Sequence, residues 1–79
     1  MRTLITIRKR GAGYIIDISA ASGLIRQGSQ CGLSPYDAAT TAAREMSTYA
    51  SENPDGGDLM APPEVLELVP PTWRSIAAK

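Results

Sequence analysis

The sequence predicts a small α+β domain in which an antiparallel sheet of three to four strands packs against one alanine-rich helix. Apolar and polar residues alternate through the N-terminal part of the chain, and glycines separate the alternating runs. A segment with helix-capping residues follows, and its apolar residues recur three and four positions apart. A chain of 79 residues has material for one hydrophobic core, so residues 1–79 are expected to form a single domain.

An N-terminal β-meander is the first expected element. Residues 3–9 alternate between apolar and polar side chains, as a strand with one buried face does. The glycines within 11–13 supply the turn to a second alternating run at 14–20. After another turn, residues 24–31 predict a third, weaker strand, in which Gly28 indicates a bulge.

One long helix is expected to follow the meander. Ser34 is suited to the N-cap, Pro35 to the first helical position, and Asp37 to the positive end of the helix dipole. The helix is expected to end before residues 53–57, because Pro54 cannot continue the helical hydrogen bonds. The face expected to lie on the sheet comprises Tyr36, Ala39, Ala42, Ala43, Met46, Tyr49 and Ala50.

The C-terminal part of the chain leaves two interpretations open. Residues 62–71 carry a proline pair at each end, which favours an edge strand, whereas the spacing of Val65, Leu68 and Val69 favours a short helix. We favour the strand. Residues 72–76 are then expected to form a short terminal turn or tail, so the element order ends in a short strand or turn.

Catalysis is not expected from this composition. The chain has no histidine, which removes the commonest general base and most zinc and iron sites. Cys31 has no cationic neighbour in sequence, which favours a structural thiol over a reactive one. The acidic run at 55–58 is too short for a calcium loop. We therefore expect a protein that is not an enzyme and uses neither a metal nor a cofactor.

Sequence features also bear on location and assembly. No apolar run approaches the length of a membrane-spanning helix or a signal peptide, and a lone cysteine fits a reducing compartment, so a cytoplasmic protein is expected. The core is thin, because the chain has no phenylalanine. A homodimer or a bound partner would add stability, although a stable monomer is the interpretation that we favour.

Charge is distributed unevenly along the chain. Residues 1–36 carry a net charge of +4 and residues 37–79 a net charge of −4. From Glu45 to Glu67 there are six acidic residues and no basic one, and this run predicts a solvated face or a docking surface for a basic partner. Trp73 lies beside Arg74 in the sequence, and both residue types are enriched at binding hot spots. Trp73 is equally suited to capping the core. The candidate partner-binding residues are Glu45, Glu52, Asp55, Asp58, Trp73 and Arg74.

The basic first hairpin gives an alternative site. Arg8, Lys9 and Arg10 form a local cation cluster that, together with Arg2 and Arg26, is able to contact a phosphate backbone; a solvated turn is the simpler interpretation. Direct binding of nucleic acid is the less favoured hypothesis, because few aromatic residues remain for stacking on bases.

Several segments together resemble small phage-encoded anti-CRISPR proteins that inhibit type I CRISPR-Cas systems. The residues that carry the resemblance are Gly13-Tyr14, Ser34-Pro35, the run from Ala38 to Met46, the run from Val65 to Pro70, and Arg74. The resemblance implies an N-terminal antiparallel meander, one alanine-rich helix and a last short strand. It also implies a protein that acts without cofactors in the host cytoplasm, by binding the RNA-guided surveillance complex or the nuclease that this complex recruits.

The sequence thus predicts a non-enzymatic, protein-binding inhibitor that docks on a type I CRISPR effector and blocks target DNA binding or cleavage. A small nucleic-acid-binding accessory protein that uses the basic hairpin is the alternative. An enzyme accessory or antitoxin-like subunit is a third hypothesis, which the sequence does not separate from the first.

Overall fold

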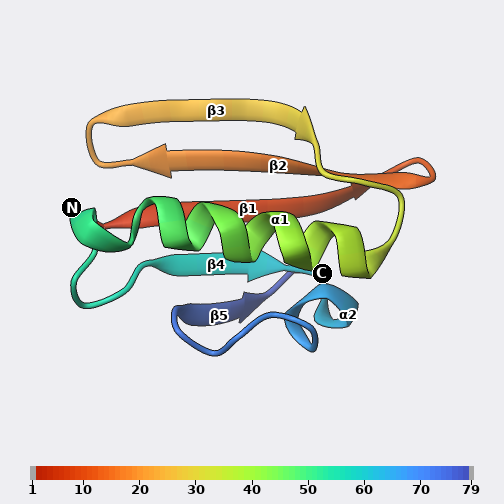
Figure 1. The fold of residues 1–79 in the computed structure, drawn as a ribbon. Coiled ribbons are helices and arrows are strands. Elements are labelled where there is room, and N and C mark those ends of the chain that lie inside the picture. Colours follow the sequence, from red (N-terminus) through yellow and green to blue (C-terminus); the bar gives the residue numbers. More distant parts are fainter. Residues whose placement is uncertain (1, 79) are drawn as a thin grey trace.

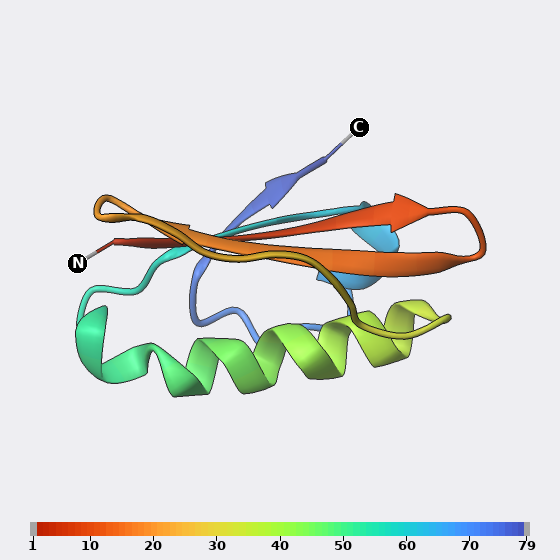
Figure 2. The same cartoon turned by 90° about the horizontal axis from the view of Figure 1, so that it is seen from above.

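The computed structural model describes residues 2–78 and shows an α+β fold with a five-stranded mixed sheet in the order β3-β2-β1-β4-β5. One main helix, α1, lies across one face of this sheet (Figures 1 and 2). The strands are β1 (Thr3–Arg10), β2 (Gly13–Ala20), β3 (Gly23–Gln30), β4 (Asp58–Ala61) and β5 (Arg74–Ala77). The helices are α1 (Pro35–Thr48), the 3₁₀ helix η1 (Ala50–Glu52) and the single turn α2 (Pro63–Leu66). The predicted fold class, with its N-terminal meander and alanine-rich helix, is confirmed.

The meander forms as the alternation predicts. Strands β1 and β2 pair antiparallel, and this register places Ile5 opposite Ile18 and Ile7 opposite Ile16. All four isoleucines are fully buried on the side of the sheet that α1 covers. Gly11 adopts a φ of 60° in the turn between the two strands, a conformation that costs glycine little.

Strand β3 is irregular and forms one edge of the sheet. Its register against β2 shifts twice, and Gly28 has a φ of 68°, as expected of a bulge. The backbone N–H of Gly28 donates to Oδ1 of Asp17 at 2.8 Å, which fixes the bulge to the neighbouring strand. Seven of the eight β3 residues are exposed, so this strand adds little to the core.

The last two strands pair in parallel, which the sequence did not indicate. Strand β4 runs parallel to β1, and β5 runs parallel to β4 at the other edge of the sheet. Parallel neighbours need a crossover connection; α1 lies on the path from the meander to β4, and α2 on the path from β4 to β5.

The preference for an edge strand over residues 62–71 was wrong. Pro62 and Pro63 begin the short helix α2, and Val65 packs into the core with 0% exposure. Proline suits the first turn of a helix because its missing N–H has no intrahelical partner there. The alternative interpretation, a short helix, was right for Pro63–Leu66, whereas Leu68 and Val69 follow the end of α2. The terminal strand forms instead at Arg74–Ala77, which overlaps the segment 72–76 expected to be a turn or tail.

Helix α1 begins where the capping residues predict. Oγ of Ser34 accepts a hydrogen bond from the backbone N–H of Asp37 at 3.1 Å. The buried face agrees with the expected one at Ala39, Ala42 and Met46. It differs at both ends, since Tyr36 is 70% exposed and Ala50 is exposed in η1, whereas Ala38, which was not expected, is fully buried. Methyl groups permit a close approach of helix and sheet that a phenol ring would prevent. The buried residues of α1 are Ala38, Ala39, Ala42, Glu45 and Met46.

Candidate functional site

The sheet has two different faces. Helix α1 covers one of them, and within residues 2–78 no helix lies over the other, as the view along the sheet shows (Figure 2). We call the uncovered side the open face. Strand alternation and the strand registers assign to it Leu4, Thr6, Arg8 and Arg10 of β1, Ile15, Asp17 and Ser19 of β2, Leu24 and Gln30 of β3, Asp58 and Met60 of β4, and Arg74 and Ile76 of β5, with Arg2 immediately before β1.

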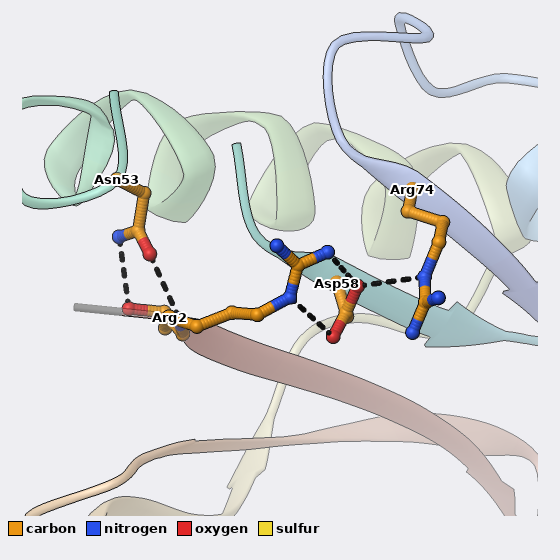
Figure 3. Close-up of polar contacts among 5 residues, drawn as sticks. Arg2, Asn53, Asp58 and Arg74 are labelled. Atoms are coloured by element: carbon orange, nitrogen blue, oxygen red, sulfur yellow. Dashed lines mark hydrogen bonds and ion pairs between the residues drawn. The ribbon is translucent and has the colours of Figure 1, made fainter. Parts of the chain in front are cut away.

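An arginine–aspartate–arginine cluster lies at one end of the open face (Figure 3). Arg2 binds Asp58 with two hydrogen bonds, from Nε to Oδ2 at 3.1 Å and from Nη2 to Oδ1 at 2.8 Å. Arg74 donates from Nε to Oδ1 of the same carboxylate at 2.9 Å. The arginine side chains remain 54% and 67% exposed, respectively, whereas that of Asp58 is 15% exposed. The cluster therefore presents two guanidinium groups to solvent and carries a net positive charge.

Parallel pairing creates this cluster. Register places Asp58 of β4 beside Leu4 of β1 and beside Arg74 of β5, so residues far apart in the sequence share one row of the sheet. Hydrogen bonding by Arg2 is the largest cause that lowers the pKa of Asp58, with further lowering from the charges of both arginines; partial desolvation opposes it. The Asp58 carboxylate is thus held in its charged form.

A buried contact beside the cluster fixes the start of β1. The backbone N–H of Thr3 donates to Oδ1 of Asn53 at 2.8 Å, and Nδ2 of Asn53 donates to Oγ1 of Thr3 at 2.9 Å (Figure 3). Nδ2 of Asn53 also donates to the carbonyl of Tyr49 at 2.8 Å. Asn53 therefore joins the end of α1 to β1, next to the point where Arg2 meets Asp58.

A second ion pair lies farther along the open face. Arg8 contacts Oδ2 of Asp17 through both Nε and Nη2 at 3.0 Å. The other carboxylate oxygen of Asp17 accepts the hydrogen bond from Gly28. Asp17 therefore binds a neighbouring strand with one oxygen and an arginine with the other. The Arg8 side chain is 55% exposed, so its guanidinium group stays accessible.

A hollow of about 490 Å³ lies at the hairpin end of the open face. The residues that line it include the exposed Leu33, the buried Ile15 and Arg10. Among the hydrogen bonds and ion pairs of residues 2–78, none joins Arg10 to a carboxylate. The lining residues are Arg10, Ala12, Gly13, Tyr14, Ile15, Gly28, Gln30, Gly32 and Leu33.

Apolar side chains occupy the middle of the open face. The β1–β4 and β4–β5 registers place Met60 between Thr6 and Ile76, one row from Leu4. Leu4, Met60 and Ile76 are half-buried, although none of the helices of residues 2–78 lies over them. Leu24, at the β3 edge, is 60% exposed. The open face thus consists of an apolar middle with arginines at both ends.

The structure separates the candidate acidic residues from one another. Glu45 is 9% exposed and accepts from Nη1 of Arg26 at 2.8 Å on the side of the sheet that faces α1. Asp58 lies between two arginines on the open face. Glu52 and Asp55 are exposed, in η1 and in the turn after it. Of the six residues proposed from the sequence, the fold brings Asp58 and Arg74 into direct contact.

Trp73 caps the core. Its side chain is 8% exposed, and its ring lies so close to Gly57 that a β-carbon at that position would come within 2.7 Å of it. The interpretation of Trp73 as a core residue is therefore confirmed, and its ring is not available as an exposed anchor.

The structure also divides the candidate nucleic-acid-binding residues. Arg8 and Arg10 lie on the open face, whereas Lys9 alternates to the opposite side and Arg26 pairs with Glu45 beneath α1. Asp17 is part of the open-face site but was not among the candidate residues. Arg2, which was expected to act together with the hairpin cluster, lies on the open face with Arg8 and Arg10. Its contact with Asp58 was not predictable from the sequence, because it depends on the pairing of β1 with β4.

Other reactive groups lie in structural positions. Burial raises the pKa of the Cys31 thiol. Burial, and then the hydrogen bond that its hydroxyl donates to Oε2 of Glu64 at 3.1 Å, raise the pKa of Tyr14. Within residues 2–78, no group of three or more histidine, cysteine, aspartate or glutamate side chains is placed to hold a metal ion. None of the helices in this part of the chain has the length and apolar character needed to cross a membrane.

No protein-family model matches the chain, and no curated protein matches its sequence. We therefore infer function from the chemistry of the open face.

Proposed function

We propose that this protein is a non-catalytic inhibitor that covers a functional surface of a partner protein, and that the partner is a type I CRISPR surveillance complex or the nuclease recruited to it. The observation that carries the proposal is the open face. A small domain that leaves half of its sheet uncovered, with ordered ion pairs around an apolar middle, has a surface suited to docking.

The fold supports the choice of partner. The resemblance in sequence implies an antiparallel meander, an alanine-rich helix and a short last strand. The chain has the meander and the helix in that order, and its last strand is β5 rather than the run from Val65 to Pro70, which begins in α2. Inhibition by occupancy needs no reacting group. It needs a rigid surface, which the paired carboxylates Asp17 and Asp58 provide by holding Arg8, Arg2 and Arg74 in place.

Two measurements test the proposed function. The purified protein is mixed with purified type I surveillance complexes, and separately with their nuclease, and the mixtures are resolved by gel filtration. Phage restriction is then measured in cells that carry the same system, with and without the protein. We expect a stoichiometric complex and a loss of restriction. The proposal is abandoned if the protein neither co-elutes with any component nor reduces restriction.

One observation favours a second candidate function, direct binding of nucleic acid by the first hairpin. Lys9 and Arg10 are exposed beside the turn, and no hydrogen bond or ion pair within residues 2–78 joins either to a carboxylate. Gel-shift titrations with duplex and single-stranded DNA over a range of salt concentrations test it, because each phosphate contact steepens the fall of affinity with salt. No shift at low salt would rule this candidate out.

A further inference from the structure

We infer that the open face docks on an acidic protein surface that also carries aliphatic side chains. This inference deepens the proposed function, because it names the surface and the chemistry of the partner. The sequence indicated that acidic residues of this chain meet a basic partner. The structure leads to the opposite assignment, in which arginines of this chain meet an acidic partner.

The net charge of the open face favours an acidic partner. The open face carries four arginines and two aspartates, a net charge of +2, although the whole chain is neutral. Both aspartates already accept hydrogen bonds from arginines, so neither is free to attract a cation. Arg10 has no such carboxylate partner within residues 2–78. The outer guanidinium groups therefore favour carboxylates from another molecule.

The apolar middle of the open face favours a partner that also carries aliphatic side chains. Leu4, Met60 and Ile76 lie between the arginine cluster at one end and Arg8 at the other. Aliphatic side chains gain stability when they leave water for an apolar contact. A partner that fits both features carries aliphatic residues opposite this strip and carboxylates on either side. Protein surfaces combine these groups.

A nucleic acid fits the open face less well. Proteins that bind single strands stack bases on aromatic rings. The four aromatic residues of the chain lie elsewhere: Tyr14 and Trp73 belong to the core beneath α1, and Tyr36 and Tyr49 are on or next to α1 itself. Three of the four arginines are already neutralised in part by Asp17 and Asp58, which weakens the field that a phosphate backbone would meet.

Two other occupants also fit less well. A second copy of the chain would bring two faces of the same net charge together, and like charges across an interface oppose association. An extended peptide added to the β3 edge would meet the two register shifts and the bulge at Gly28, and such irregularities hinder strand pairing. The face of the sheet is therefore a better docking surface than its β3 edge.

A peptide selection tests this inference without assuming the identity of the partner. Short random peptides displayed on phage are selected on the immobilised wild-type protein. The enriched peptides are synthesised, and their affinities for the wild type and for three single variants are measured by calorimetry. Arg10→Glu reverses an unpaired charge on the open face, Ile76→Ser removes apolar surface there, and Arg44→Glu is the matched control on the exposed side of α1.

We expect the selected peptides to be rich in Asp, Glu and aliphatic residues. Arg10→Glu should weaken their binding about tenfold, as the loss of one ionic contact does, while Arg44→Glu should leave it unchanged. Ile76→Ser should mainly speed dissociation. Circular dichroism and urea denaturation of each variant show that a lost affinity is not a lost fold.

Several results would overturn the inference. They are a selection that yields no enriched peptide, enriched peptides without acidic residues, or affinities that do not respond to Arg10→Glu and Ile76→Ser. Tighter binding of a DNA duplex that depends on Arg10 would assign the face to nucleic acid, and a dimer that Ile76→Ser dissociates would assign it to a second copy. If acidic peptides bind the open face but the protein does not co-elute with any CRISPR component, the proposed function is disproved and the inference about the open face stands.

Discussion

Asn53 holds Thr3 through both atoms of its side-chain amide, across fifty positions of sequence. The two residues are buried, at 5% and 0% exposure, and all of their polar side-chain atoms have partners. This contact closes the turn after α1 onto the first residue of β1. It thereby fixes the position of Arg2, the residue before Thr3, whose side chain hydrogen-bonds to Asp58.

Asn53→Ala is expected to destabilise the protein by about 2–3 kcal/mol, because it leaves the buried N–H and hydroxyl of Thr3 without a partner. Thr3→Val removes the hydroxyl while the backbone hydrogen bond remains, and it should cost less, about 1 kcal/mol. Urea denaturation of the two single variants and the double variant measures the coupling between them. Strictly additive costs would show that the two side chains do not depend on each other.

Asp58→Asn tests the electrostatics of the arginine cluster. The pKa of Asp58 is lowered in the folded chain, chiefly by the hydrogen bond from Arg2, so its charged form stabilises the fold above the ordinary value of 3.8. That contribution is lost as the pH falls through the lowered pKa. The wild type should therefore be more stable than the variant near neutral pH, and the difference in urea midpoint should shrink below pH 3.8. A difference that does not depend on pH would contradict this account.

Two neighbouring alanines of α1 should differ in how much their enlargement to leucine destabilises the protein. Ala42 is fully buried against the sheet, so Ala42→Leu is expected to cost roughly 1–3 kcal/mol through overpacking. Ala43 is half-buried and lines a hollow next to Pro70, so Ala43→Leu should change stability by no more than about 0.5 kcal/mol. Thermal denaturation followed by circular dichroism gives both values. Equal costs would mean that α1 is rotated from the position described.

Ser34→Ala is expected to cost about 1 kcal/mol, because Oγ of Ser34 accepts the N–H of Asp37 at the start of α1. Thr40→Ala is the matched control on the exposed side of the same helix, where the hydroxyl bonds to the helix's own backbone. Alanine is a good helix former, so this control should be neutral or slightly stabilising. Loss of stability in the control and none in Ser34→Ala would place the cap elsewhere.

Local signals predicted the parts of the fold that depend on local chemistry. Gly11 and Gly28 marked a turn and a bulge because positive φ angles favour glycine. Ser34 marked the helix start because a side-chain oxygen was available for an N–H without a helical partner. At α2, by contrast, the proline pair was given more weight than the helical spacing of Val65, although Pro63 is well suited to a first helical turn.

Long-range pairing set the parts that the sequence did not predict. Nothing near Asp58 in the sequence indicates that β4 pairs with β1, yet this pairing brings Arg2 and Asp58 together across 56 positions. The acidic run along the chain was consequently expected to form one surface. Partners supplied by distant strands divide it, since Arg26 pairs with Glu45 and Arg74 joins Asp58. Charge along a sequence becomes a charged surface only through the strand order.

The central claim is that the open face binds the partner, and two methionines on opposite sides of the sheet test it most directly. Met60 lies on the open face, whereas Met46 is 4% exposed between α1 and the sheet. The protein is labelled with ¹³C at the methionine methyl groups and titrated with an acidic, aliphatic peptide from the selection. We predict that the Met60 methyl signal shifts in proportion to occupancy while the Met46 signal stays in place. Saturable binding that shifts Met46 and leaves Met60 unchanged would contradict the account.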